Sequence, residues 1–575
     1  MKRKIVFTGI LLFLGFTFIS SVFSQEKGGG AGTEWKELME EAWKLSRDHD
    51  FETGLVVATK AFELAKNNCP SNHLDIAESA EFLAYFYKAQ LHNQKAEQLY
   101  KQSLQIKEKV LGPDHFDVTK ILYSFSDLYF RMSEYSKAEA LLHRSIKIFE
   151  QHPEYDQAEF AFTLGSLANV YSAQGKYKKA EALFKRAVKI LEDHRNTNPQ
   201  KLCFVLNTFA NLHFKQGKYS KANSLYKRVA RITTETYGPE DLKIAIPLNN
   251  IAMIYGTQEN YAMAESFLKQ ALEITEKNLG SNHPETTLER GNLAVVYWKR
   301  GYYKKAAHLL EHVIKMQRKT IGPNHPDLAR NLNNLAGIYQ KEAYYKKAEE
   351  VSKQSLLMRK KLFGSDHPDV AESLNTLAYL YYKEGRYSEA EALVKQALKI
   401  GTEKLSPTHA EIAPNLDTLA QVYTAQGKYD KAEPLFRQAL TIREKALGST
   451  ISSSAEIKRH LAQLYLKQGD YKKAEPLFKQ ALLIQEKALD LDHPDVAKTL
   501  NGLAQIYVAQ KEYNKADPLL KRALKIREKK LRPNHPDTIE TQTNLVHLYR
   551  ATQRNKEAEE LEQQIKKRAT PSKSR

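Results

Sequence analysis

Apolar side chains recur along this chain with the spacing of paired helices. Leu332, Leu335, Ala336 and Tyr339 lie at i, i+3, i+4 and i+7, which places them on one face of a helix. The apolar positions of residues 471–489 have the same spacing and predict a second helix. A Gly or a polar residue separates the two kinds of helix and indicates a left-handed turn. The pattern therefore predicts a nearly all-α protein built from helical hairpins.

The tyrosine of the first helix recurs every 42 residues, without insertion or deletion. It occupies Tyr87, Tyr129, Tyr171, Tyr255, Tyr297, Tyr339, Tyr381, Tyr423, Tyr465, Tyr507 and Tyr549, and His213 stands at the one remaining position. Nine residues after each of these positions there is an alanine, from Ala96 to Ala558, where a larger side chain would push two crossing helices apart. A fixed period in this range predicts a stack of identical helix pairs rather than several globular domains.

Each pair ends in a loop of the His-Pro-Asp type, with Pro and Asp starting the next helix. The histidines at this repeat position are His73, His115, His283, His325, His367, His409, His493 and His535. Successive loops lie roughly 10 Å apart, too far for imidazoles to share a metal ion, so the pattern favours a turn-stabilising role over a metal-binding edge. Pro434, Pro476 and Pro518 are predicted to lie in the first turn of the second helix, where an N–H is not needed.

The Leu-Ala-x-x-Tyr motif of the first helix, followed by Ala and Phe or Leu in the second, resembles tetratricopeptide repeats. The longer period, with sequences such as YKKAEPLFKQAL and the HPD loop, is similar to the repeats of kinesin light chains and their bacterial relatives. The resemblance covers about residues 70–566 and implies an all-α, right-handed α-solenoid of antiparallel helix pairs.

This reading divides the chain into five parts. They are a signal peptide or membrane anchor at 1–24, a flexible linker at 25–33, a degenerate capping helix pair at 34–69, twelve 42-residue repeats at 70–566, and a disordered basic tail at 567–575. In the capping pair, Leu45 stands at the tyrosine position and Gly54 at the alanine position. We expect stability to follow nearest-neighbour rules, as in other stacks of repeats.

The N-terminus predicts export. Basic residues 2–4 precede the apolar stretch 5–23, and Ser24 offers a small residue before a cleavage site at Gln25. The alternative is an uncleaved anchor, because nineteen residues can just cross a bilayer. Either reading predicts a bacterial envelope protein that is periplasmic or secreted, or is held at the inner membrane by residues 5–23.

Composition adds few candidate chemistries. The net charge of +19 comes from Lys and Arg in every repeat, often beside Glu, which indicates solvated helix surfaces rather than a nucleic-acid interface. Cys69 and Cys203 lie in different repeats, and their spacing predicts neither a disulfide nor a metal site. No catalytic triad pattern, phosphate loop or HExxH motif occurs, so we predict no catalytic residue, metal or cofactor.

The family resemblance implies that the first helices line a concave groove in which partners lie. The residues that it places there are Asn207, Asn249, Asn250, Asn292, Trp298, Lys299, Asn333, Asn334, Lys341, Asn375, Tyr382, Lys383, Lys467 and Asn501. Asn can pair with a peptide backbone, Lys with a carboxylate, and aromatic rings with apolar anchors. These residues predict a groove for an extended, partly acidic polypeptide. The alternative is that the asparagines bridge neighbouring helices inside the stack.

The function expected from these features is that of a non-catalytic scaffold or adaptor that binds another protein. An envelope-assembly factor that binds a polysaccharide or another polymer is the second hypothesis, because aromatic side chains on the groove would suit it too. An enzyme or enzyme-regulatory subunit is the third. We expect no nucleic-acid partner, and contact with a membrane only through an uncleaved N-terminal segment.

Overall fold

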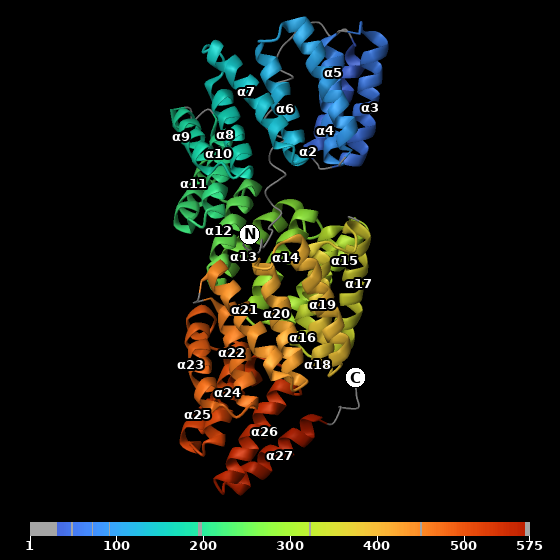
Figure 1. The fold of residues 1–575 in the computed structure, drawn as a ribbon. Helices are drawn as coiled ribbons and strands as arrows, with labels where there is room; N and C mark the ends of the chain where they lie inside the picture. Colours follow the sequence, from blue (N-terminus) through green and yellow to red (C-terminus); the bar gives the residue numbers. More distant parts are fainter. Residues whose placement is uncertain are drawn as a thin grey trace. The chain divides into compact units, whose positions relative to one another are not determined.

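A computed structural model describes residues 31–569 except 48–49, 72, 91, 194–197, 321, 323 and 449–450 (Figure 1). All regular structure in these residues is helical, as predicted. The predicted signal peptide or anchor at 1–24, most of the linker and the end of the basic tail lie outside the described residues. The chain divides into two compact units, with the division between Pro247 and Leu248.

The N-terminal unit consists of five helix pairs and a short 3-10 helix. Its elements are α2 (Thr33–Arg47), α3 (Phe51–Asn68), α4 (Leu74–Ala89), α5 (Asn93–Leu111), α6 (Phe116–Arg131), α7 (Tyr135–Gln151), α8 (Gln157–Ala173), α9 (Tyr177–Asp193), α10 (Pro199–Lys215), α11 (Tyr219–Tyr237) and η3 (Leu242–Ile244). The first helix of each pair has an even number and is called an A helix; the second has an odd number and is called a B helix.

The C-terminal unit continues the same alternation. Its elements are α12 (Ala245–Thr257), whose first residues precede the division, α13 (Tyr261–Leu279), α14 (Pro284–Lys299), α15 (Tyr303–Thr320), α16 (Pro326–Lys341), α17 (Tyr345–Phe363), α18 (Pro368–Lys383), α19 (Tyr387–Lys404), η4 (Ala410–Ile412), α20 (Ala413–Ala425), α21 (Tyr429–Leu447), α22 (Ser452–Lys467), α23 (Tyr471–Ala488), α24 (Pro494–Ala509), α25 (Tyr513–Lys530), α26 (Pro536–Ala551) and α27 (Asn555–Ala569).

A helices form the inner wall of each unit, and B helices form the outer wall. Most A helices pack on their own B helix and on the B helix before it, and A helices of neighbouring pairs also contact one another, as α8 contacts α10 and α16 contacts α18. This closer approach of the A helices curves the stack toward them. Function in such a stack depends on which side chains the two walls present.

The helix crossings are as the repeat pattern predicts. The twelve repeat alanines are all buried, from Ala96 with no exposed surface to Ala558 with 1 %. The turn after most A helices contains a residue in the left-handed region. Gly175, Gly217, Gly301, Gly385, Gly427 and Gly469 have φ of 73–78° there, and Ser133, Glu259, Ala343, Lys511 and Gln553 reach φ of 57–62° in the same turn.

The prediction for the three repeat prolines was wrong. Helix α21 begins at Tyr429, so Pro434 is its sixth residue and lies beyond the first turn; Pro476 of α23 and Pro518 of α25 occupy the same position. The B helices begin earlier than the prolines suggested, at the second tyrosine of the repeat or its equivalent. Each proline therefore removes one intrahelical hydrogen bond, on the exposed side of its helix.

The repeat tyrosine joins consecutive pairs. Its hydroxyl donates to a glutamate of the preceding B helix, over 2.9 Å from Tyr129 to Glu97 and over 2.7 Å from Tyr465 to Glu433. The same bond occurs in the repeats of Tyr381, Tyr423 and Tyr507. Where Ala307 replaces the glutamate, Glu311 accepts instead. The hydrogen bond explains why this position holds Tyr rather than Phe.

The histidine ladder caps helices. In all eight repeats Nδ1 of the loop histidine accepts the backbone N–H two residues later, over 3.1–3.3 Å. Asp156 and Asp241 perform the same N-cap role in two further repeats. The predicted turn-stabilising role is confirmed, and its physical form is an imidazole acting as a neutral acceptor at the helix N-terminus.

The first helix pair departs from the repeat consensus where it meets its neighbour. At Gly54 a Cβ would lie 2.2 Å from the ring of Phe86, so the ring fills the space that an alanine methyl uses in other pairs. Trp35 Nε1 donates to Ser79 Oγ over 2.7 Å, and the N–H of Ala31 donates to Asp75 over 3.0 Å. These bonds attach the degenerate pair to α4.

Candidate partner-binding site

All fourteen residues predicted for the groove lie on A helices, from α10 to α24. Their exposure differs. Lys383 and Lys467 are exposed, whereas Asn250, Asn333 and Asn501 are buried, with 2 %, 5 % and 3 % of their surface accessible. The other nine are half-buried. The three buried asparagines cannot contact a partner in this conformation, because neighbouring helices cover them.

Two of the asparagines bridge neighbouring A helices, which was the alternative reading. Asn544 Nδ2 donates to Asn501 Oδ1 over 3.0 Å, joining α26 to α24. Asn249 Nδ2 donates to Glu289 over 2.8 Å, joining α12 to α14. Burial raises the pKa of the Glu289 carboxyl to about 7, although the bonds from Asn249 and Thr275 favour its charged form. Sequence reasoning did not single out this glutamate.

Aromatic side chains of the predicted set lie beside lysines. The Trp298 ring packs over Gly337 of the next A helix, where a Cβ would come within 3.1 Å of it, and Lys299 Nζ lies 5.3 Å from the ring centroid. On α18, Lys383 Nζ lies 5.6 Å from the ring of Tyr379 and 5.5 Å from that of Tyr382. Such contacts hold an ammonium group over aromatic faces.

A second set of contacts, which we call the seam, joins segments of the C-terminal unit that are far apart in sequence. Arg300 bonds to Asp490 over 2.9 Å, Ser452 Oγ to Glu259 over 2.6 Å, and His535 Nε2 lies 2.9 Å from the carbonyl oxygen of Lys341. The partners are 190, 193 and 194 residues apart, which is about four and a half periods of 42. The seam is therefore where one superhelical turn meets the next.

Lys341 lies at the centre of the seam. Its Nζ is 3.7 Å from Asp495 and 3.9 Å from Glu456. Burial favours the neutral amine, but the two carboxylates outweigh it and raise the pKa of Lys341 well above its usual value. Burial would raise the pKa of Glu456, but Lys341 lowers it to about 2. Lys341 is the last residue of its A helix, so its side chain reaches the next turn rather than an open groove.

The two superhelical turns also pack closely against each other in the seam. A Cβ at Gly301 would lie 2.5 Å from Cδ of Pro494 and 3.3 Å from the ring of His493. Lys530 Nζ lies 3.6 Å from the ring centroid of Tyr302, and the Arg532 guanidinium lies 4.4 Å from that of Tyr344. Sequence reasoning missed the seam, because a period shows which residues are equivalent but not how many repeats complete a turn.

Comparison with known families agrees with this geometry. The tetratricopeptide repeat model matches residues 75–151, 202–277, 284–356, 332–403, 378–445, 453–529 and 503–569, and a second tetratricopeptide model matches 163–198. The chain belongs to the tetratricopeptide repeat family. Among curated proteins nothing matches.

Solved structures similar to this tetratricopeptide protein include kinesin light chain-like repeats. The Podosopora anserina putative kinesin light chain repeats are 28 % identical, with a TM-score of 0.31, over 36 % of this chain and 96 % of that one. BtubC (BKLC) from P. vanneervenii is 25 % identical, with a TM-score of 0.31, over 40 % and 90 %. The apo form of RapI is 13 % identical, with a TM-score of 0.49, over 64 % and 98 %.

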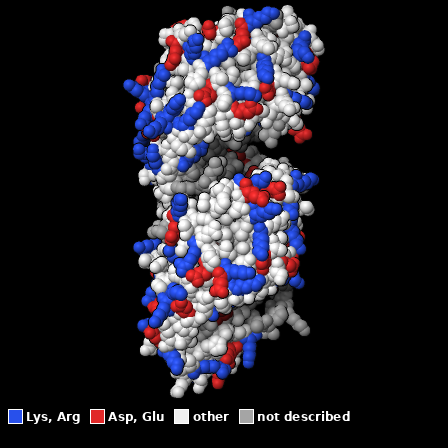
Figure 2. All heavy atoms as spheres, in the orientation of Figure 1, with Lys and Arg blue, Asp and Glu red and all other residues white. Residues whose placement is uncertain are grey.

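Charge is not spread evenly over the tetratricopeptide repeats, contrary to expectation. Residues 177–237, from the start of α9 to the end of α11, contain 13 Lys and Arg but four Asp and Glu, so they carry +9 of the net +19. Figure 2 shows Lys and Arg side chains gathered where Figure 1 places these helices. Arg186–Glu150 and Arg228–Glu192 ion pairs connect neighbouring B helices there.

One group of potential metal ligands lies close together, contrary to the expectation from cysteine spacing. The ligand atoms of Cys69, His73 and Asp75 are within 4.8 Å of one another. His73 Nδ1 already accepts the N–H of Asp75, and Asp75 accepts that of Ala31. Burial raises the pKa of the Cys69 thiol, which disfavours the thiolate that a metal would need. These bonds explain the cluster as a cap of the first repeat.

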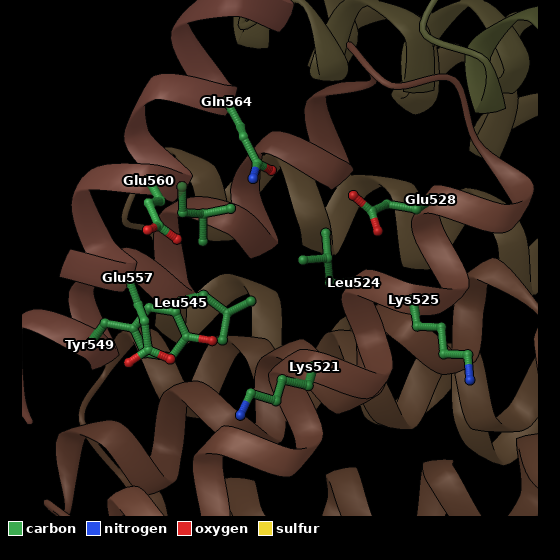
Figure 3. Close-up of a pocket in the computed structure, with 10 residues that line it drawn as sticks. Lys521, Leu524, Lys525, Glu528, Leu545, Tyr549, Glu557, Glu560 and Gln564 are labelled. Carbon is green, nitrogen blue, oxygen red and sulfur yellow. The ribbon is translucent and has the colours of Figure 1, made fainter. Parts of the chain in front are cut away.

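The end of the stack contains an open recess of about 330 Å³ (Figure 3). Leu524 of α25, Leu545 of α26 and Leu561 of α27 give it apolar lining. Figure 3 shows Lys521 and Lys525 on one side and Glu557 and Glu560 on the other.

None of the helices in the described part of the chain is long and apolar enough to cross a membrane.

Proposed function

We propose that this tetratricopeptide protein is a non-catalytic scaffold that binds an extended polypeptide along the inner wall formed by its A helices. The observation that carries the proposal is that half-buried amide, aromatic and basic side chains recur at equivalent positions of consecutive A helices. A repeated array of this kind suits a ligand that is itself a repeating chain. Family membership supports protein binding in general.

The set of contact residues is narrower than the sequence suggested. Asn250, Asn333 and Asn501 are left out of the proposed contacts because they are buried. Lys341 is left out because it forms ion pairs inside the seam. Reversing the charge of Lys341 would break the fold as well as any groove, so it cannot test binding. The proposed contacts that remain include Asn292, Trp298, Asn334, Asn375, Tyr382, Lys383 and Lys467.

Site-specific photo-crosslinking in the native host tests the proposal. A photoreactive amino acid at Asn375 places the probe on the inner wall, and one at Leu357 of α17, where 72 % of the side chain is exposed, is the matched outer-wall control. We expect polypeptide adducts from position 375 and few from 357. Adducts only from 357 would refute inner-wall binding.

A polysaccharide ligand is the alternative outcome of the same assay. It would give adducts that resist proteases and are removed by glycosidases, and the chain would then bind a glycan array rather than peptides.

We also propose that the chain is exported, because residues 1–24 have the order of a secretory signal. Mass measurement of the chain recovered from its host tests this. A mature N-terminus at Gln25 would support cleavage, and an intact Met1 in a membrane fraction would support an anchor. A full-length chain in the cytosol would contradict export.

A further inference from the structure

The outer wall of the N-terminal unit carries a surface that we call the basic patch, formed by the consecutive B helices α9 and α11 (Figure 2). These two helices contain nine Lys and Arg and four Asp and Glu, whereas the consecutive B helices α19 and α21 contain seven and six. The basic residues of the patch are Lys178, Lys179, Lys185, Arg186, Lys189, Lys221, Lys227, Arg228 and Arg231. Such a local excess of one sign creates a potential that attracts anions.

The arginines of the patch are already paired, whereas several of its lysines are not. The arginine ion pairs are Arg186–Glu150 over 3.4 Å, Arg228–Glu192 over 2.5 Å and Arg231–Glu235 over 3.8 Å. Four exposed lysines form no ion pair with any residue that the structure describes, and they are Lys178, Lys189, Lys221 and Lys227. The charge that the patch offers to a partner is therefore mainly that of lysine.

Helix α11 lacks two carboxylates that α9 has at the same repeat positions. In α9, Glu181 pairs over 3.0 Å with the lysine four residues later. Asn223 stands at this position in α11, so Lys227 has no such counter-charge. Thr234 likewise stands where α9 has Glu192. The excess of positive charge thus arises from departures from the repeat sequence and not only from its general basic character.

The cations follow the solvent side of each helix. Lys178, Lys185 and Lys189 lie at i, i+7 and i+11, which is one ridge along α9. Lys227 and Arg231 lie at i and i+4 and continue the patch on α11. Because the ridges belong to B helices, they lie on the wall opposite to the A helices.

We propose that the basic patch docks the N-terminal unit on the surface of a bilayer that contains anionic phospholipids. Lysine is a hydrated point charge on a flexible stem, whereas the fork of arginine suits phosphates held in fixed positions, as in nucleic acids. Lipid headgroups diffuse within their layer and can gather under dispersed lysines without a preformed pocket. Basic side chains near an anionic leaflet each add to the attraction.

This membrane contact goes beyond the proposed scaffold function and beyond the contact that the sequence predicted for residues 5–23. With the outer wall on the lipid, the A helices of the same unit face away from the bilayer. A polypeptide bound along them would therefore be held beside a membrane without competing for the same surface.

Sedimentation of the full chain with lipid vesicles tests the proposal. One set of vesicles contains phosphatidylcholine alone, and the other contains equal parts of phosphatidylcholine and phosphatidylglycerol. Binding to the neutral vesicles measures any insertion of residues 1–24. We expect additional binding to the anionic vesicles, and we expect this addition to decrease as salt is added.

A variant without the unpaired lysines locates the contact. It carries Lys178→Gln, Lys189→Gln, Lys221→Gln and Lys227→Gln. Its affinity for the anionic vesicles should fall about a hundredfold at low salt, since each basic side chain near the leaflet contributes a factor of about five. Its melting temperature should not change, because these exposed side chains form no ion pair within the described residues.

A matched control removes the same number of charges from B helices of the C-terminal unit. It carries Lys353→Gln, Lys395→Gln, Lys479→Gln and Lys521→Gln, at four exposed lysines that each pair with a carboxylate four residues earlier. We expect this variant to bind the anionic vesicles as the wild-type chain does. An equal loss in both quadruple variants would show that net charge alone is responsible and would overturn the patch.

A second variant changes the patch without removing a lysine. Asn223→Glu with Thr234→Glu restores the two carboxylates that α9 has at these positions. We expect it to weaken binding to the anionic vesicles about tenfold or more, since two added negative charges oppose the attraction of the lysines. Unchanged binding by this variant would contradict the proposal.

Two further outcomes would overturn membrane docking. One is equal binding of the wild-type chain to neutral and anionic vesicles. The other is a labelled DNA duplex or polyglutamate chain that binds more tightly than the vesicles and loses its affinity in the variant without the unpaired lysines. Crosslinking from Asn375 reports on the inner wall, so the scaffold function and the basic patch can fail separately.

Discussion

Replacing His493 by Asn should remove a pH dependence of stability that is built into the seam. His493 is 4 % exposed, and its Nδ1 accepts the N–H of Asp495 over 3.1 Å. Burial lowers the pKa of this imidazole from 6.5 to about 4. A proton would occupy the nitrogen that caps α24 and would place a charge in a closely packed site.

The sign of the effect follows from which state binds the proton more tightly. The unfolded chain does, so the stabilisation is complete above about pH 6.5 and is lost as the pH falls toward 4. A tenfold change in proton affinity corresponds to about 1.4 kcal/mol. The neutral His493 therefore contributes about 3 kcal/mol to the free energy of unfolding, of which about 2 kcal/mol is lost by pH 5. Asn is a good N-cap that does not titrate, so the variant keeps the cap and loses this pH dependence.

Urea unfolding of both proteins at pH 7.5, 6 and 5 provides the measurement. Between pH 7.5 and 5 the wild-type chain should lose about 2 kcal/mol relative to His493→Asn. Glu289, whose pKa is raised to about 7, changes stability in the opposite direction over this range, but it does so equally in both proteins. His367→Asn, at a half-buried equivalent of the cap, is the control. A difference between wild type and His493→Asn that stays constant over this range would refute the reasoning.

Three further changes probe other contacts. Gly427→Ala should cost about 1 kcal/mol because its φ is 76°, and Gly301→Ala, at φ 73°, should cost at least about 2 kcal/mol more because its methyl would meet the next turn; equal melting temperatures would contradict the seam. Tyr465→Phe should cost about 1–2 kcal/mol by denaturation, and a double-mutant cycle with Glu433→Gln should show most of that as coupling. Ala390→Leu should crowd one helix crossing and cost about 1–3 kcal/mol, so an unchanged melting curve would place Ala390 outside it.

The sequence was informative wherever the interaction is local. Helix pairing, buried alanines, left-handed turns and a structural role for the loop histidines all follow from contacts within or between adjacent pairs. The sequence pattern placed the repeat tyrosine on the apolar face of its helix, but it did not predict the hydrogen bond of the hydroxyl. The glutamate that accepts this bond is one of many on exposed helix faces, so the sequence does not single it out. The proline error arose at a helix start, where local preference does not determine which residue begins the helix.

The groove residues were harder to predict. Their positions on A helices follow from the period, but burial at Asn333 and Asn501 depends on how closely neighbouring A helices approach. The engagement of Lys341 depends on the number of repeats per superhelical turn, which is set by small rotations summed over many pairs. A local sequence pattern does not predict the number of repeats per superhelical turn.

The seam also bears on how the chain is made. The surface of residues near 300 is covered only after residues about 190 positions later have been synthesised. At a synthesis rate of about 5–20 residues per second, that interval lasts about 10–40 seconds. During this interval the surface around Tyr302 and Tyr303 is exposed, and chaperones or other copies of the chain can bind to it. Truncations that end before residue 490 should prolong that exposure indefinitely and aggregate, even though every helix pair they retain is intact.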